Sequence, residues 1–389
     1  MLILAKSILG MMIGFFLAVV LGWFLIPVLK KLKCKQSISV FTAFSHAKKN
    51  GTPTIGGLIF IIPTLLAMLF LYLRGSLQIT HSLLIILFVF ISYAMLGFVD
   101  DYLKIREHNN DGLSIPQKLL AQVLIALIFF YIYMQGGGDA NVTISSLNIS
   151  VDMKWFYGIF ILFLLVGSSN AVNLTDGLDG LAGGIATIFF VTISIIINYT
   201  GIYNGLDASL SLIMVGATLG FLVHNFHPAK IFLGNSGSMF LGYMIAVISL
   251  LGFKNVTITS VIVPLLILAV PILDTFFAIV RRIIKGQSPT QGDKKHIHHQ
   301  LLQMTSSQVK TVLIIYLVDI LFSCASIIYV IKNAKLGQII YAILVVIVLW
   351  FVLTTDIVFD RKTIKDDIIH KVNKKNKEEK EIIEKSGEK

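Results

Sequence analysis

The stretch Asn173-Leu-Thr-Asp176-Gly-Leu-Asp179-Gly-Leu-Ala-Gly-Gly184 carries an amide, two carboxylates and four glycines between two long apolar runs. Asn173, Asp176 and Asp179 are three residues apart, so on a helix they would lie along one face. Ionisable groups at the edge of a membrane-spanning run are costly, and they mark a functional site by default. We therefore expect this stretch to join two membrane helices and to carry chemistry.

The composition is that of an integral membrane protein. Of the 389 residues, 56% are hydrophobic and 14% are charged, whereas soluble proteins carry about 25% charged residues. The predicted fold is an all-α polytopic membrane protein, a bundle of about eleven (alternatively about ten) transmembrane helices. Residues 1–355 form one catalytic domain, and the charged tail 356–389 is expected to be partly disordered. The predicted spans are 8–29, 55–73, 82–99, 117–134, 155–172, 181–200, 208–226, 231–251, 257–280, 311–331 and 336–354.

The basic residues predict the orientation of the bundle. Of the 32 Lys and Arg residues, 26 fall in alternate loops and in the C-terminal tail, and the positive-inside rule assigns these segments to the cytoplasm. The net charge of +11 then reflects cytoplasmic loops that face anionic membrane lipids, and nucleic acid is not expected as a partner. The outer loop 135–154 alternates polar and apolar residues, which predicts a short β-hairpin.

Five polar motifs all fall on the side assigned to the cytoplasm. Each has a structural interpretation when taken alone: a glycine pair permits close helix packing, aspartates can end or cap a helix, and histidines can cluster on a surface. Their shared face favours one common site. The motifs are Lys48-Lys-Asn-Gly-Thr-Pro-Thr-Ile-Gly-Gly57, Asp100-Asp-Tyr-Leu-Lys104, Asn173 to Asp179, Gly234-Asn-Ser-Gly-Ser238 and Asp293-Lys-Lys-His-Ile-His-His299.

The residue types in these motifs are those of phosphoryl transfer. Carboxylates bind Mg²⁺ while phosphates complete its coordination, and lysines offset phosphate charge. Glycine-rich turns let backbone N–H groups approach phosphate oxygens. The sequence contains neither a Walker lysine loop nor a dinucleotide-binding fingerprint, so no ATP-driven step is expected. The prediction is phosphoryl transfer to a lipid phosphate at the cytoplasmic surface of the membrane.

In these motifs and their order, the sequence resembles the polyprenyl-phosphate N-acetylhexosamine-1-phosphate transferases (glycosyltransferase family 4) over about residues 10–330. The segment ending at Gly57, and Gly112-Leu-Ser-Ile-Pro-Gln-Lys118, resemble the branch that transfers phospho-MurNAc-pentapeptide. Asn225-Phe-His-Pro-Ala-Lys-Ile-Phe-Leu-Gly234 and the histidine loop resemble the branch that transfers GlcNAc-1-phosphate for teichoic acid or O-antigen. Because the histidine loop contacts the sugar in this family, we expect the GlcNAc branch, with the muramoyl branch as the alternative.

The resemblance implies that undecaprenyl phosphate and a UDP-N-acetyl sugar react with Mg²⁺ (Mn²⁺ as a substitute) to give a lipid diphosphate sugar and UMP. The reaction would take place at the cytoplasmic face of the plasma membrane, by direct attack of the lipid phosphate; whether the chain forms a homodimer stays open. The catalytic residues implied are Asp100, Asp101, Asp176, Asp179, His296, His298 and His299. The substrate-binding residues implied are Lys49, Thr54, Gly56, Gly57, Lys104, Lys118, Asn173 and Lys294, and the metal ligands are Asn173, Asn235 and Asp101.

Position 235 departs from the family pattern. The resembled family has Gly-Asp-x-Gly-Ser, in which the aspartate is a metal ligand, whereas this chain has Asn235. An amide offers Mg²⁺ one neutral oxygen in place of a carboxylate, so weaker metal binding is expected.

A more distant alternative is a transporter of lipid-linked substrates. Transporter sites lie near the bilayer midplane at broken helices, often in repeated halves. Here the polar motifs gather on one face, and only Asp274 and Asp319 lie inside apolar runs. The enzyme interpretation is therefore favoured.

Overall fold

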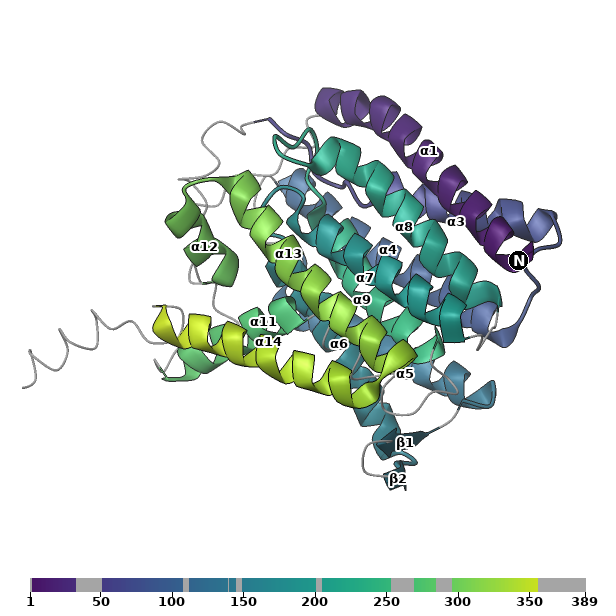
Figure 1. Ribbon diagram of the computed structural model, residues 1–389. Helices are drawn as coiled ribbons and strands as arrows, with labels where there is room; N and C mark the ends of the chain where they lie inside the picture. Colours follow the sequence, from purple (N-terminus) through teal and green to yellow (C-terminus); the bar gives the residue numbers. More distant parts are fainter. Residues whose placement is uncertain are drawn as a thin grey trace, which may run out of the picture.

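The computed structural model describes residues 2–32, 51–107, 112–138, 140–144, 149–200, 205–252, 269–284 and 296–355. Long helices run side by side through the molecule, with a two-stranded ribbon at one end (Figure 1). The helices are α1 (Leu2–Lys31), α3 (Leu58–Leu73), α4 (His81–Glu107), α5 (Ile115–Gln135), α6 (Phe156–Thr175), α7 (Leu181–Thr200), α8 (Gly205–Asn225), α9 (Gly234–Gly252), α11 (Ala269–Ile284), α12 (Ile297–Thr305), α13 (Gln308–Ile327) and α14 (Ala334–Thr354).

Within the described part of the chain, nine helices are long and apolar enough to cross a membrane. They correspond to nine of the predicted spans and show an all-α polytopic membrane protein. The predicted span 55–73 appears as α3, a shorter apolar helix of 16 residues. Of the predicted span 257–280, only residues from Ala269 onward are described, as the start of α11. The expected total of eleven spans therefore stays a prediction, and the tail 356–389 lies outside the described residues.

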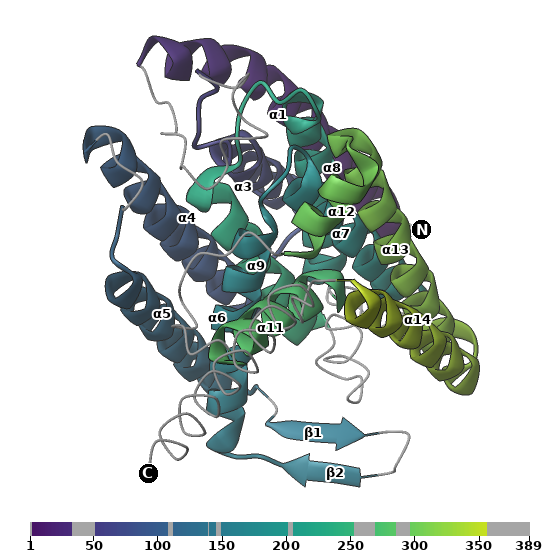
Figure 2. The same cartoon turned by 90° about the vertical axis from the view of Figure 1, so that its left-hand side faces the viewer.

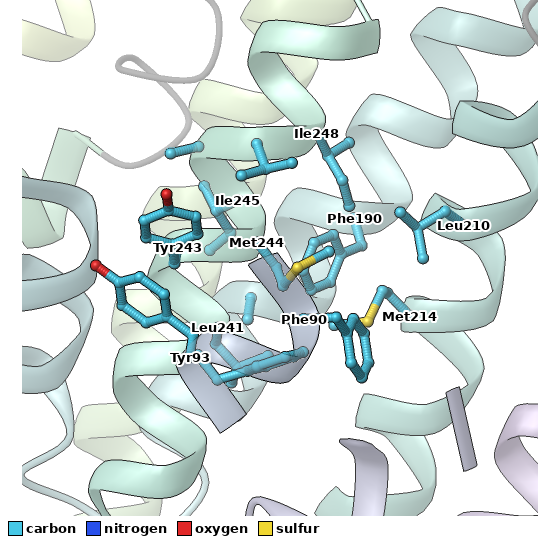
Figure 3. Packing of buried hydrophobic residues seen from close by; sticks show 14 of the residues in the cluster. Phe90, Tyr93, Phe190, Leu210, Met214, Leu241, Tyr243, Met244, Ile245 and Ile248 are labelled. Carbon is cyan, nitrogen blue, oxygen red and sulfur yellow. The ribbon is translucent and has the colours of Figure 1, made fainter. Parts of the chain in front are cut away.

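Helix α9 lies at the centre of the bundle and packs against α4, α6, α7 and α8. After its polar first turn, its sequence is apolar on nearly all sides, which is the pattern of a helix surrounded by others. Phe90 of α4, Phe190 of α7, Met214 of α8 and Met244 of α9 meet in this core (Figure 3). Residues on the outer helices, such as Phe16 and Trp350, expose large apolar side chains, as expected of surfaces that face lipid.

Polar residues fix several helix ends. Ser114 caps α5 in a capping box with Gln117, Ser307 caps α13 and Asn333 caps α14. Such side chains satisfy backbone N–H groups that have no partner within the helix. They mark where each helix leaves the apolar region.

Two short strands lie in the loop between α5 and α6. β1 (Asn141–Ile144) and β2 (Ile149–Asp152) pair antiparallel, with Asn141 opposite Asp152 and Ile144 opposite Ile149. They project from one end of the bundle, beyond α5 and α6 (Figure 2). The alternating sequence of this loop predicts strands in the same place. Helix α12, which begins in the histidine motif, lies toward the opposite end (Figure 1).

Candidate active site

Asp100 is the most densely bonded carboxylate of the site. It is buried near the end of α4, and its oxygens lie 2.7 Å from Lys104 Nζ and 2.9 Å from Lys118 Nζ. It also accepts hydrogen bonds from the backbone N–H of Leu113 and from the side-chain amide of Asn235. Two cations therefore surround one buried carboxylate, and both lysines keep part of their surface exposed, 20% and 18%. They can still contact a second anion, such as a phosphate.

Asp101 anchors the beginning of α9. One carboxylate oxygen accepts the backbone N–H of Asn235 at 3.0 Å, and the other accepts that of Ser236 at 2.9 Å. A negative charge at a helix N-terminus is favourable because the helix dipole presents unpaired N–H groups there. Gly234 precedes these residues with a positive φ of 71°, and a Cβ there would overlap Asp101 Oδ2. Only glycine fits this approach, so Asp101 joins the ends of α4 and α9.

Asp176 differs from both of these aspartates. It is the residue directly after α6, its side chain is half-buried, and within the described structure no hydrogen bond to its carboxyl group is found. Burial, and then the charges of Asp101 and Asp179, raise the pKa of Asp176 to about 7. Three carboxylates are thus close enough to repel one another, and Asp176 is the one whose oxygens are open.

Asp179 is held by the loop that follows α8. Its Oδ2 atom lies 2.9 Å from Nδ1 of His227 and 3.1 Å from the backbone N of Ala229. The next residue, Gly180, donates its N–H to Asn225 at 3.0 Å, and its carbonyl accepts the hydroxyl of Tyr316. No role was predicted for His227 or Asn225 from the sequence. Their position at the end of an apolar run does not indicate which loop they contact.

The histidine motif is organised by Asp274 of α11. One carboxylate oxygen of Asp274 accepts the backbone N–H of Ile297 at 2.7 Å, and the other lies 3.1 Å from His296 Nδ1 and 3.4 Å from His298 Nδ1. The sequence placed Asp274 in an apolar run and did not reveal these partners. His298 reaches the stretch after α6, because a Cβ at Gly177 would overlap its Nε2 atom. His299 lies beside His298, with ring centroids 4.3 Å apart.

The remaining predicted site residues have different surroundings. The backbone N–H groups of Gly56 and Gly57 donate to the carbonyls of Phe232 and Leu233, which favours a packing role for both glycines. Thr54 is buried beside Gly234. Asn173 accepts the hydroxyl of Ser238 at 2.6 Å through its side-chain oxygen. Lys49 and Lys294 lie outside the described residues.

The carboxylates of the site could bind a hard cation such as Mg²⁺ only if the substrate supplied further oxygen ligands. Among the described residues, no three acidic, histidine or cysteine side chains converge so as to enclose an ion. Asp176 nevertheless has open oxygens in a place where Asp101 and Asp179 add negative charge. Mg²⁺ commonly takes one or two protein carboxylates and completes its shell with phosphate oxygens and water. The open carboxylate oxygens of Asp176 match that requirement.

An all-helical membrane bundle that gathers carboxylates, lysines and histidines at the helix ends defines a class, the membrane-embedded transferases that act on phosphate groups. A family model for glycosyl transferase family 4 matches residues 83–253, which include every aspartate of the site except Asp274. A phospho-N-acetylmuramoyl-pentapeptide-transferase of Oceanobacillus iheyensis is 38% identical over 323 residues, which is 82% of this chain and 96% of that protein. The chain belongs to glycosyl transferase family 4.

Other relatives bear the same name. The phospho-N-acetylmuramoyl-pentapeptide-transferase of Halalkalibacterium halodurans is 36% identical. That match spans 82% of this chain and 96% of that protein. That of Bacillus subtilis is 42% identical, over 62% of this chain and 73% of that protein. The expected membership of the GlcNAc-1-phosphate branch is not supported by these names, which favour the muramoyl alternative. The prediction of the GlcNAc branch relied too heavily on the histidine loop.

Proposed function

We propose that this transferase moves phospho-MurNAc-pentapeptide from its UDP-linked donor to undecaprenyl phosphate and releases UMP, at the cytoplasmic face of the plasma membrane. The observation that carries the proposal is the buried Asp100 carboxylate between Lys104 and Lys118. It presents two cations at a helix end, and the next residue, Asp101, is close enough to the open carboxyl group of Asp176 to raise the pKa of that group. This arrangement suits a reaction in which two phosphate groups must approach each other against their mutual repulsion.

The side chains divide the work between the two substrates. Lys104 and Lys118, kept in place by Asp100, bind and orient the phosphate of the lipid, whose oxygen attacks the donor directly. His298, held near Gly177 by the Asp274 contact, and His299 beside it contact the diphosphate or the sugar of the donor. Positioning and charge neutralisation account for most of the catalysis in such a transfer.

A divalent cation, Mg²⁺ or Mn²⁺, belongs to this proposal. Asp176 and Asp101, with the side-chain oxygens of Asn173 and Asn235, are the residues that would hold it. When bound, it would neutralise the charge that develops on the donor diphosphate. The amide of Asn235 places no negative charge beside Asp100, so the proposal includes weaker cation binding than a carboxylate at this position would give.

The GlcNAc-1-phosphate reaction is the second candidate. It is favoured by His-Ile-His-His at 296–299, where the muramoyl branch typically has three consecutive histidines followed by Phe-Glu. These relatives weigh more, because each is matched over 96% of its own length and 82% of this chain.

The two candidates differ in the donor that supports UMP release. The purified chain in detergent is incubated with undecaprenyl phosphate, Mg²⁺ and either UDP-MurNAc-pentapeptide or UDP-GlcNAc. We expect UMP only with the muramoyl donor. UMP release with UDP-GlcNAc alone would establish the second candidate. A lack of UMP with both donors, while radiolabelled substrate crosses liposomes uncleaved, would support the transporter interpretation.

A further inference from the structure

The segment between α8 and α9 connects the two aspartate pairs of the site. Near its beginning, His227 and Ala229 contact Asp179. At its end, the backbone N–H groups of Asn235 and Ser236 bind Asp101. Between these points, the backbone of Phe232 and Leu233 pairs with the glycines before α3. The segment, residues 226–236, therefore spans the site from one acidic residue to another, and we refer to it as the bridging segment.

Two separate sets of contacts hold residues 179 and 180. The backbone of Gly180 is fixed through its N–H by Asn225 and through its carbonyl by Tyr316. The side chain of Asp179 is fixed by the bridging segment, through Nδ1 of His227 and the N–H of Ala229. Loss of His227 would therefore leave the backbone bonds in place and remove a donor that orients the carboxylate.

Exposure distinguishes the two members of this pair. The side chain of Asp179 is 2% exposed and that of His227 is 36% exposed. A buried carboxylate needs donors to offset its desolvation, and the imidazole supplies one from the protein surface. The charge of Asp179 acts on Asp176. Any movement of the Asp179 carboxylate therefore changes the electrostatic field at the open carboxyl group of Asp176.

We propose that His227 is a positioning residue for the transfer reaction, acting through Asp179. Its Nδ1–H group holds the Asp179 carboxylate in a fixed orientation, and this orientation sets the electrostatic field at Asp176, which would hold the cation that neutralises the donor diphosphate. This inference rests on the proposed function and extends it to a residue outside the acidic and histidine motifs. Hydrogen bonds to charged groups are strong enough that the loss of one changes an equilibrium about tenfold to a hundredfold.

The test compares His227→Ala with His227→Asn, whose side-chain N–H lies where Nδ1 of histidine lies. We expect His227→Ala to lower kcat for UMP release about thirtyfold while KM for undecaprenyl phosphate changes less than about threefold. His227→Asn should recover activity to within about fivefold of the native chain. Lys230→Gln is the matched control, because it removes an exposed charge from the same segment without contacting Asp179, and it should leave kcat unchanged.

A double-mutant cycle shows whether His227 acts through Asp179. In the Asp179→Asn background, His227→Ala should lower kcat by no more than about twofold, because the carboxylate it orients is gone. Losses that multiply, or a His227→Asn variant as impaired as His227→Ala, would overturn the proposal and indicate that the imidazole contacts substrate itself.

Hydrogen exchange separates this inference from the proposed function. If the native chain releases no UMP with either donor, the proposed function fails. The contact can still be followed by the exchange of the backbone amide of Ala229, which donates to the same Asp179 oxygen that His227 contacts. His227→Ala should accelerate this exchange several-fold, while His227→Asn and Lys230→Gln should not. Equal exchange of this amide in His227→Ala and in the native chain would show that His227 does not orient the Asp179 carboxylate.

Discussion

The two aspartate pairs of the site differ in how their oxygens are satisfied. All four carboxylate oxygens of Asp100 and Asp101 accept hydrogen bonds or contact lysines. In the second pair, Asp179 is bonded to His227 and Ala229. Asp176, in contrast, has no hydrogen bond to its carboxyl group within the described residues.

This difference separates a framework from a reactive centre. The first pair joins the ends of α4, α5 and α9 and fixes where the lysines lie. The second pair contains the carboxyl group of Asp176, which can gain or lose a proton, or bind a cation, without breaking a protein contact. Residue type alone would have placed all four aspartates in one category.

Replacing Asp100 should have the largest effect. Asp100→Ala leaves Lys104 and Lys118 without the carboxylate that orients them, and a broken buried ion pair is strongly destabilising. We expect kcat for UMP release to fall at least about a thousandfold and the melting temperature in detergent to fall as well. Asp100→Asn is the control, since it keeps the shape and removes the charge. A loss of less than about tenfold in Asp100→Ala would contradict the role of this pair as a framework.

Asn235→Asp should change the dependence on Mg²⁺. The substitution removes the amide that donates to Asp100 and adds a negative charge near two aspartates, so the variant should need a cation more and bind it about tenfold more tightly. Titration of UMP release and of the melting temperature with MgCl₂ measures both effects. Asn235→Ala removes the same hydrogen bond without adding charge and serves as the control. Identical Mg²⁺ curves for the native chain and Asn235→Asp would defeat the expectation.

The proton on Asp176 should make cation binding depend on pH. Because its pKa is raised to about 7, the carboxyl group is protonated below pH 7, and bound Mg²⁺ must displace that proton. The apparent Mg²⁺ affinity should rise about tenfold per unit of pH up to pH 7 and then level off. Asp176→Asn should flatten this profile, which calorimetry at several pH values would measure.

The same shift has a consequence for stability. The folded protein binds this proton more strongly than the unfolded chain, so without cation the free energy of unfolding should fall as pH rises from about 4 to 7. Asp176→Asn should remove that fall. A native chain whose melting temperature and Mg²⁺ affinity do not respond to pH across this window would contradict an open Asp176.

Gly177→Ala should have the smallest effect. A methyl group at this position meets His298 Nε2, while Asp274 restrains the other side of the ring. We expect KM for the UDP-linked donor to rise about threefold to tenfold and KM for undecaprenyl phosphate to stay constant. Steady-state kinetics with each substrate varied in turn measures this. If Gly177→Ala changes only the KM for undecaprenyl phosphate, His298 contacts the lipid substrate and not the UDP-linked donor.

The fold was largely predictable because hydropathy reports directly on which segments partition into lipid. The helices that were harder to predict are those that are short or that carry charged residues. α3 has 16 residues, and α11 carries Arg281 and Arg282 in its last turn. These depend on neighbouring helices that the local sequence does not specify.

The sequence predicted which motifs form the site, but it did not predict which residues contact one another there. The motifs that contain Asp101, Asp176 and Asn235 do meet at the helix ends. The partners His227 and Asp274 were missed because each lies in a different segment from the carboxylate or histidine that it binds. Such pairs arise from which helix ends pack together, and no spacing rule within one segment reports that.

The most direct test of the account follows the phosphorus atoms of the donor. UDP-MurNAc-pentapeptide labelled with ³²P in the β-phosphate is incubated with the purified chain, undecaprenyl phosphate and Mg²⁺. Transfer of the sugar with its phosphate predicts that the label enters the lipid fraction while unlabelled UMP appears in equal amount. Label released as UDP, or label that stays in intact donor, would contradict a phospho-sugar transferase.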